Sequence, residues 1–205
     1  MKINKFIIIL VAGLILCACG RSKQAQFYML NPVPPKMVPA SRYAYLKIGV
    51  DAIRTPAFTE KPQLMIYDSF NRVQLEEFHQ WAESLDKNIR RVIKTNLNTL
   101  LPGVVMEDAP WDIEFKPDYT LKINISEFKV DLLGNSSLRA DYIIFHQGQV
   151  IKKYEKFYHT KVPSVTVETL VSSMNSNLNH LTQDIAKALA VEKQVKRSER
   201  TRELN

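Results

Sequence analysis

The side chains that most often carry chemistry are few and scattered in this sequence. Only two of its 205 residues are cysteine and four are histidine. The histidines do not stand at the spacing of metal ligands, so we predict neither a metal site nor a cofactor. Carboxylates are adjacent at Glu76–Glu77 and Glu107–Asp108, but neighbouring side chains on a helix or strand point apart. Because no Gly-rich phosphate loop and no Gly-x-Ser-x-Gly motif occurs either, the sequence argues against an enzyme.

The N-terminal segment is the exception, because both cysteines lie there. Two lysines precede an apolar run from 6 to 16, which is shorter than the roughly 20 residues of a membrane-spanning helix and typical of a secretion signal. The run continues into Leu16-Cys17-Ala18-Cys19, which resembles the bacterial lipobox. In that motif a small residue precedes the cysteine that becomes the acylated N-terminus. Since Ala18 is small and Leu16 is bulky, we expect acylation at Cys19.

Acylation at Cys19 would anchor the protein to lipid without a transmembrane helix. Cys17 would leave with the signal peptide, so no free thiol would remain for a disulfide, a metal or catalysis. Gly20 follows the cysteine where an Asp resembles an inner-membrane retention signal, so we expect the bacterial outer membrane, facing the periplasm. The alternative is a signal that is uncleaved or conventionally cleaved, with two incidental cysteines.

Composition indicates one ordinary globular core. Apolar residues make up 45% of the chain and charged residues 24%, which excludes a disordered, collagen-like or disulfide-scaffold protein. The 28 basic and 21 acidic residues give a net charge of 28 − 21 = +7. The excess is spread along the chain and is not interleaved with aromatic residues, so we expect no nucleic-acid partner.

Hydrophobic periodicity predicts the elements that must position any site. Two long segments repeat apolar residues with the period of an amphipathic helix, over 85–101 and 167–189. Shorter segments read as strands, with a hairpin turn at 68–72 and a bulge near Ser126–Glu127. The expected strands cover 27–30, 43–50, 64–67, 73–75, 119–132, 138–145 and 150–160, and the last three form an antiparallel meander.

We therefore predict an α+β fold, with a mainly antiparallel sheet and two long amphipathic helices packed on one face. The expected organisation is a lipoprotein signal peptide at 1–18, a lipidated tether at 19–26, one folded domain at 27–191 and a charged C-terminal tail at 192–205. The tail is expected to fray into solvent; its alternative role is a basic contact with phosphate headgroups.

Several short segments carry a resemblance to a known family. They occur in its order and spacing and are Phe27-Tyr28-Met29-Leu30, Ile48-Gly49-Val50, Lys61-Pro62-Gln63-Leu64, Phe78 to Leu85, Ile89-Arg90-Arg91-Val92 and Ala109-Pro110-Trp111. The chain resembles the ABC-transporter auxiliary lipoproteins, and among them the outer-membrane lipoprotein component of the paraquat-inducible MCE system. The resemblance runs from about 27 to 189. The chain departs from the family pattern at Lys61, where an arginine is usual, so any contact that relied on a guanidinium fork is lost.

The resemblance implies a role in intermembrane lipid transport that is not enzymatic. Proteins of this family sit on the inner leaflet of the outer membrane and partner with an MCE-domain periplasmic protein, whose rings form a tunnel from an inner-membrane transporter. A ring-shaped homo-oligomer would suit docking at the end of that tunnel, and phospholipid or a related amphiphile would be the substrate.

Six residues of the matching segments are candidates for a partner interface: Lys61, Pro62, Gln63, Trp81, Glu83 and Trp111. Each also has a structural interpretation. Trp81 can pack under the hairpin, Pro62 and Gln63 can shape its entry, and Glu83 can favour the N-terminus of the following helix. Trp111 lies in a loop, where contacts are common.

Two other functions fit an envelope lipoprotein. One is an outer-membrane assembly lipoprotein that acts on a β-barrel or on lipopolysaccharide transport. The other, from a different class, is a peptidoglycan-binding protein or an envelope hydrolase. An apolar groove would favour lipid transport, whereas a polar cleft holding a carboxylate with a perturbed pKa would favour an enzyme.

Overall fold

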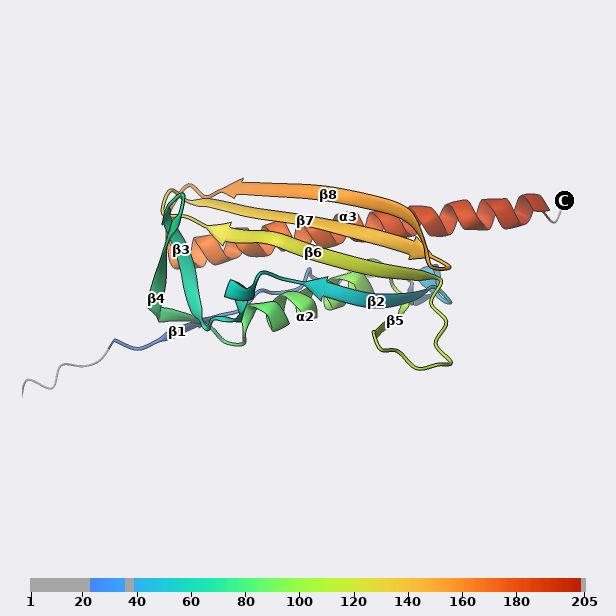
Figure 1. Ribbon diagram of the computed structural model, residues 1–205, viewed down its shortest axis with the longest axis horizontal. Helices are drawn as coiled ribbons and strands as arrows, with labels where there is room; N and C mark the ends of the chain where they lie inside the picture. The colour runs from blue at the N-terminus through green and yellow to red at the C-terminus, as the bar shows by residue number, and fades with distance from the viewer. Residues whose placement is uncertain (1–22, 36–38, 204–205) are drawn as a thin grey trace, which may run out of the picture.

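The structure, a computed structural model, describes residues 23–35 and 39–203. The expected signal peptide and the expected acylation site at Cys19 lie outside the described residues. The described chain forms two β-sheets and two long helices (Figure 1). Its strands and helices are β1 (Gln26–Tyr28), β2 (Lys47–Arg54), β3 (Gln63–Ser69), β4 (Arg72–Trp81), α2 (Leu85–Leu100), β5 (Val105–Asp108), β6 (Tyr119–Val130), β7 (Asn135–His146), β8 (Gln149–Lys161) and α3 (Val167–Glu203), with 3-10 turns at Ala40–Tyr43 and Ala57–Glu60.

The larger sheet has the strand order β5-β2-β6-β7-β8. Its β6-β7-β8 part is the antiparallel meander that the sequence predicts. The register shifts between Ile125 and Glu127, at the predicted bulge. The β7–β8 turn is made by Gln147 and Gly148, both with positive φ, which suits the tight turns that connect antiparallel strands. Local periodicity and turn residues thus determine this half of the sheet.

The expectation of one mainly antiparallel sheet is confirmed only in part, because there are two sheets and both are mixed. In the larger sheet, β2 pairs in parallel with β5 and with β6. The smaller sheet has the order β1-β4-β3, in which the β3–β4 hairpin is antiparallel and β1 runs parallel to β4. Parallel neighbours are joined by long connections, which leave no signature in the residues of the strands themselves.

Two further strands, the one expected at 43–50 and β5, also differ from the prediction. The expected strand over 43–50 is replaced by a 3-10 turn, Ala40–Tyr43, and by β2, which starts at Lys47. The break falls at Tyr45, whose φ of 70° is incompatible with an extended strand. The four-residue strand β5 was not predicted, because alternation over so few positions is weak.

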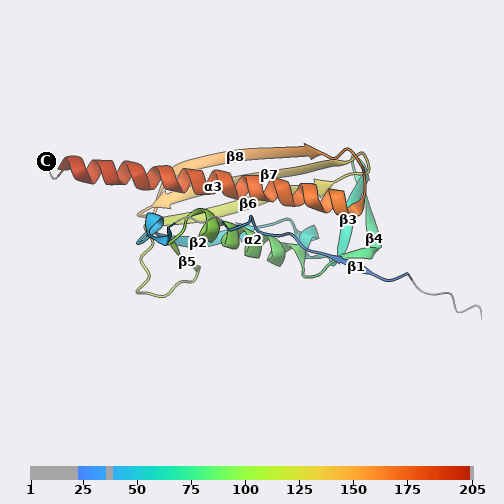
Figure 2. The same ribbon diagram turned by 180° about the vertical axis from the view of Figure 1, so that it is seen from behind.

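The two helices form a layer over the larger sheet. Seen from behind, α2 and α3 both lie in front of the strands (Figure 2). α3 packs against β7 and β8 and lies beside α2. It extends through 192–203, the segment that was expected to fray. The α+β class is therefore confirmed.

One hydrophobic cluster joins the sheets and helices. Its fully buried members include Ile89 and Leu97 from α2, Leu178 and Leu181 from α3, and Leu121 from β6. Burying a side chain of this size contributes about 1.5–3 kcal/mol. The described body is thus held by a single core, on which the polar contacts discussed below are superimposed.

A small polar cluster fixes the middle of α3 to β8. Asp184 accepts a hydrogen bond from Tyr158 Oη at 2.9 Å and lies 3.0 Å from Lys156 Nζ. Partial burial raises the pKa of Asp184, but the hydrogen bonds from Lys156 and Tyr158 and the charges of Lys156 and Lys187 outweigh this effect. The pKa of Asp184 therefore lies below its ordinary value.

This depressed pKa predicts a pH-dependent contribution to stability. The contribution is fully present above the ordinary aspartate pKa and is lost as the pH falls through the lower pKa of the folded state. We expect Asp184→Asn to destabilise the protein by about 0.5–1 kcal/mol at neutral pH, because the site is partly screened by solvent. Urea unfolding as a function of pH measures the difference, which must shrink below about pH 4. The control is Glu155→Gln, since that carboxylate lies 3.9 Å from Lys153 and is mostly exposed. A difference that keeps its size in acid would contradict the prediction.

Candidate functional site

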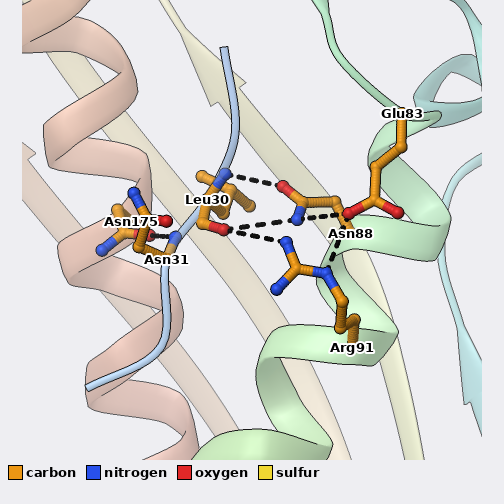
Figure 3. Close-up of polar contacts among 6 residues, drawn as sticks. All are labelled: Leu30, Asn31, Glu83, Asn88, Arg91 and Asn175. Carbon is orange, nitrogen blue, oxygen red and sulfur yellow. Dashed lines mark hydrogen bonds and ion pairs between the residues drawn. The ribbon is translucent and has the colours of Figure 1, made fainter. Parts of the chain in front are cut away.

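The described chain begins with a segment that is held by asparagine side chains. Leu30 is fully buried between the helices, and its backbone N–H donates to Asn88 Oδ1 at 2.6 Å. Asn88 Nδ2 donates back to the Leu30 carbonyl at 3.3 Å. The next residue, Asn31, donates its N–H to Asn175 Oδ1 of α3 at 2.6 Å (Figure 3). We call residues 30–33 the strap, because they lie across both helices (Figure 2).

The backbone donors of the strap are all accounted for. Pro32 has no N–H, and Val33 donates to Asn96 Oδ1 at 2.7 Å. Asn96 is itself buried, and its amide nitrogen donates to Asn179 and Thr182 of α3. Because a buried N–H without a partner is costly, these asparagines replace the ladder that a β-strand would supply. The strap is therefore fixed to the body at three successive donors.

Glu83 orients the first of these asparagines. Its Oε1 accepts from Asn88 Nδ2 and from Arg91 Nε, both at 2.9 Å. Arg91 Nη2 in turn donates to the Leu30 carbonyl at 3.4 Å (Figure 3). Glu83 thus lies just before the start of α2, as the sequence suggested, and it also holds the groups that bind the strap.

Four of the six candidate interface residues meet where the strap begins. The Trp81 N–H donates to the Pro62 carbonyl at 2.7 Å, and Gln63 pairs with Gln80 of β4. Trp81 is only 6% exposed and pairs across to Tyr28 of β1. The packing interpretation of Trp81 is therefore the one that the geometry supports. With Glu83, these residues join the hairpin, α2 and the entering chain.

Lys61 and Trp111 lie apart from this junction in different ways. Lys61 is exposed and follows the 3-10 turn Ala57–Glu60, where its N–H donates to the Phe58 carbonyl. Trp111 packs over β2, where a Cβ added to Gly49 would approach its ring to 2.7 Å. Gly49 is thus required for the close approach of the indole. Trp111 is half-buried. The Phe115 ring lies edge-on to the indole, with 6.3 Å between the ring centroids.

A groove of about 510 Å³ lies between the end of the β3–β4 hairpin and the ends of β6, β7 and β8. This volume is in the usual range for small-molecule sites, about 300–1,000 Å³. Apolar side chains form much of the lining, among them Phe70, Leu132, Leu133 and Phe157. A groove of this size and character can accept part of an amphiphile.

One carboxylate of the groove, Glu127, has a lowered pKa. Burial raises the pKa of Glu127, but hydrogen bonds from Ser137 and Lys129 outweigh it and lower the pKa below the usual value. Asp131 accepts from the N–H groups of Leu133 and Asn135 at 2.9 and 2.8 Å, which closes a turn. A general acid at neutral pH needs a raised pKa, so Glu127 is not suited to that role, and Asp131 stabilises the turn.

Within residues 23–35 and 39–203, no group of three or more His, Asp or Glu side chains could hold a metal ion. None of the helices in the described part of the chain is long and apolar enough to cross a membrane.

Comparison with known proteins assigns the chain to a family. The model of the ABC-type transport auxiliary lipoprotein component matches residues 28–186, which include the strap, its asparagines and the groove. The chain belongs to this family. Two family relatives are the intermembrane transport lipoproteins PqiC of Escherichia coli (strain K12) and of Shigella flexneri. Each is 23% identical to this chain over 147 residues, which is 71% of this chain and 77% of the relative.

Solved structures show the same fold in distant relatives. Protein XCC0632 from Xanthomonas campestris aligns with a TM-score of 0.68 at 12% identity, covering 85% of this chain and 99% of that protein. An uncharacterised protein aligns with a TM-score of 0.67 at 18% identity, covering 82% of this chain and 99% of its own. The auxiliary-lipoprotein fold described here is therefore shared across weakly similar sequences.

Sequence reasoning missed the asparagines that hold the strap of this auxiliary lipoprotein. Asn88 and Asn96 stand eight residues apart, on the same face of α2 as Ile89 and Val92, and both are buried. A polar residue inside an apolar stripe was the available signal. An asparagine there suggests a buried amide with a backbone partner elsewhere in the chain.

The strap predicts an asymmetry between two asparagines of α2. Asn88→Ala would leave the buried N–H of Leu30 without its acceptor and would remove one donor to the Leu30 carbonyl. We expect this to reduce the free energy of unfolding by about 1–3 kcal/mol. Asn98→Ala is the matched control, because Asn98 is exposed on the same helix, and it should change stability by less than about 0.5 kcal/mol. Urea unfolding measures both, and hydrogen exchange at residues 30–33 should accelerate in Asn88→Ala alone. Equal effects of the two substitutions would refute the role of the strap.

Proposed function

We propose that this chain is the outer-membrane-anchored lipoprotein subunit of an MCE-type intermembrane lipid transport complex. Its N-terminal acyl chains on Cys19 would lie in the periplasmic leaflet of the outer membrane. The folded body would meet the end of the periplasmic tunnel formed by an MCE-domain protein, which connects to an inner-membrane transporter. The substrate would be phospholipid, and the chain itself would be a binding subunit and not an enzyme.

The observation that carries this proposal is the family match over the whole folded body, residues 28–186. The relatives in Escherichia coli and Shigella flexneri are named as intermembrane transport lipoproteins, and they support the same role here. The strap adds a physical argument. Asn88, Asn96 and Asn175 bind the strap, so the point at which the chain leaves the body toward the expected anchor is fixed.

The groove supports lipid transport more than it supports catalysis. Its lining combines Phe70, Leu133 and Phe157 with Glu127, whose pKa is lowered, so these residues suit the binding of an amphiphile more than acid catalysis. Oligomerisation into a ring is part of the proposal and would place several grooves around one axis. The contacts of Lys61, Pro62 and Trp111 with a partner stay predictions, and Lys61 and Pro62 have the exposure that such contacts need.

The proposal predicts a complex that depends on Cys19. Full-length protein should be extracted from membranes in mild detergent after crosslinking in cells, and native mass spectrometry should find an oligomer that carries an MCE-domain subunit or bound phospholipid. Cys19→Ala should abolish acylation and membrane recovery. Cys17→Ala is the matched control, because it leaves a small residue two positions before Cys19 and should be processed normally.

A bare monomer, without lipid or partner even after crosslinking, would contradict the transport role. It would shift the balance to an assembly or peptidoglycan-binding lipoprotein. Loss of acylation in Cys17→Ala but not in Cys19→Ala would instead show that the lipobox was misplaced.

A further inference from the structure

Three loops at one end of the body expose large apolar side chains to solvent. Phe70 at the tip of the β3–β4 hairpin is 90% exposed, and Leu133 in the β6–β7 turn is 71% exposed. Leu132 and Val165 are about half exposed on the same turn and on the loop before α3. Figure 1 shows these three loops gathered at the end where the hairpin stands. We call Phe70, Leu132, Leu133 and Val165 the apolar rim.

Contacts between the loops make the rim one surface. The Leu132 N–H donates to the Tyr67 carbonyl at 3.0 Å, which joins the β6–β7 turn to the end of β3. A Cβ added to Gly134 would lie 3.0 Å from a methyl group of Val165, so the third loop touches the same turn. Phe70, Leu132 and Leu133 also line the mouth of the groove.

The exposed leucines stand on a rigid turn. Asp131 Oδ1 accepts from the N–H groups of Leu133 and Asn135, and Asp131 Oδ2 accepts from the Asn135 side chain at 2.8 Å. Gly134 has the positive φ that the turn requires. Since exposed turn tips normally carry polar residues, a rigid turn that presents two leucines indicates a surface that is covered by an apolar partner.

The tether leaves the body at the same end. β1 pairs with the end of β4, and the described chain runs outward from there to Lys23 (Figure 1). Exposed apolar side chains also occur on β4 and β1, at Leu75, Phe78 and Phe27, and Lys23 Nζ lies 5.2 Å from the centroid of the Phe78 ring. The strap fixes this geometry, because the residues just after β1 are bound to both helices.

The length of chain before Lys23 determines what this end can reach. Lys23 lies four positions after Cys19 in the sequence, and four residue steps span at most about 14 Å. This step rests on the acylation that forms part of the proposed function. With acyl chains at Cys19, the end of the body that carries the rim is held within a short distance of the bilayer surface.

We propose that the apolar rim inserts into the headgroup layer of the phospholipid membrane that holds the anchor. Phe70 and Leu133 would enter the boundary between headgroups and acyl chains, as the apolar faces of peripheral membrane proteins do. Lys23 and Lys161 are exposed at this end and would meet phosphate groups. The mouth of the groove would then open directly onto the lipid leaflet, so that a phospholipid could pass between them.

The test uses full-length acylated protein in vesicles of phosphatidylethanolamine and phosphatidylglycerol. Acylation leaves the mature chain without a free thiol, so a single introduced cysteine can be labelled with an environment-sensitive dye. The test variants are Phe70→Cys and Leu133→Cys. The controls are Tyr45→Cys and Ile113→Cys, because these side chains are 92% and 95% exposed and belong to segments near the opposite end of the sheet. Circular dichroism confirms that each variant is folded.

We expect the dye at 70 and 133 to shift to shorter wavelength and to be quenched by lipids that carry a nitroxide near the headgroup. The dye at 45 and 113 should stay accessible to aqueous iodide. Four labels that all remain in water would overturn the proposal. So would a wavelength shift at 70 and 133 without lipid quenching, since that result indicates a protein interface, either a second copy or another subunit.

The same samples separate this proposal from the proposed function. Intact mass spectrometry shows whether Cys19 is acylated. If the protein is acylated but the dyes at 70 and 133 stay in water, the rim proposal fails and the proposed anchor stands. If Cys19 is unmodified, the anchor fails. Flotation of the unlabelled chain with the same vesicles then decides the rim: binding that is lost in Phe70→Ser/Leu133→Ser supports it, and no binding by the parent chain overturns it.

Discussion

The pairing of Asn88 with the backbone of Leu30 is the interaction on which the rest of the arrangement depends. A single amide satisfies both the N–H and the carbonyl of a fully buried residue, and Glu83 and Arg91 hold that amide in position. Without this pairing the buried N–H of Leu30 would have no acceptor. The segment after β1 cannot replace it with a regular β-ladder, because Pro32 has no N–H to donate. The path of the chain from its N-terminal side to the core is thus set by polar contacts, and the buried pair between Asn88 and Leu30 is strengthened by exclusion of water.

The parts of this fold that the sequence predicts are those with a local cause. The helix from Leu85 and the bulge after Ile125 follow from apolar spacing and are confirmed. The parallel pairing of β2 with β6, and of β1 with β4, depends on segments far apart in the chain, and alternation within a strand does not encode its partner. The asparagines of the strap were missed for the same reason, since their partners lie 58 or more residues away.

Several candidate interface residues from the family motif make structural contacts within the chain itself. Pro62, Trp81 and Glu83 stand together because each holds part of the junction between the hairpin, α2 and the entering chain. A partner that binds this surface would therefore contact residues whose positions are already fixed by the core. Trp111 lies elsewhere, seated on Gly49 of β2, so the six candidates do not form one continuous patch.

The two ends of the molecule differ in the way their apolar residues are supported. At the far end Tyr45 and Ile113 are also exposed, and single exposed apolar residues are ordinary on protein surfaces. At the tether end Leu133 stands on a turn closed by three hydrogen bonds that the Asp131 carboxylate accepts, and Leu133 and Phe70 both line the groove. Because the hydrogen bonds to Asp131 hold this turn in place, Leu133 stays exposed unless an apolar partner covers it. The strap holds the chain just after β1, and the first described residues lie at that same end, together with the rim and the groove.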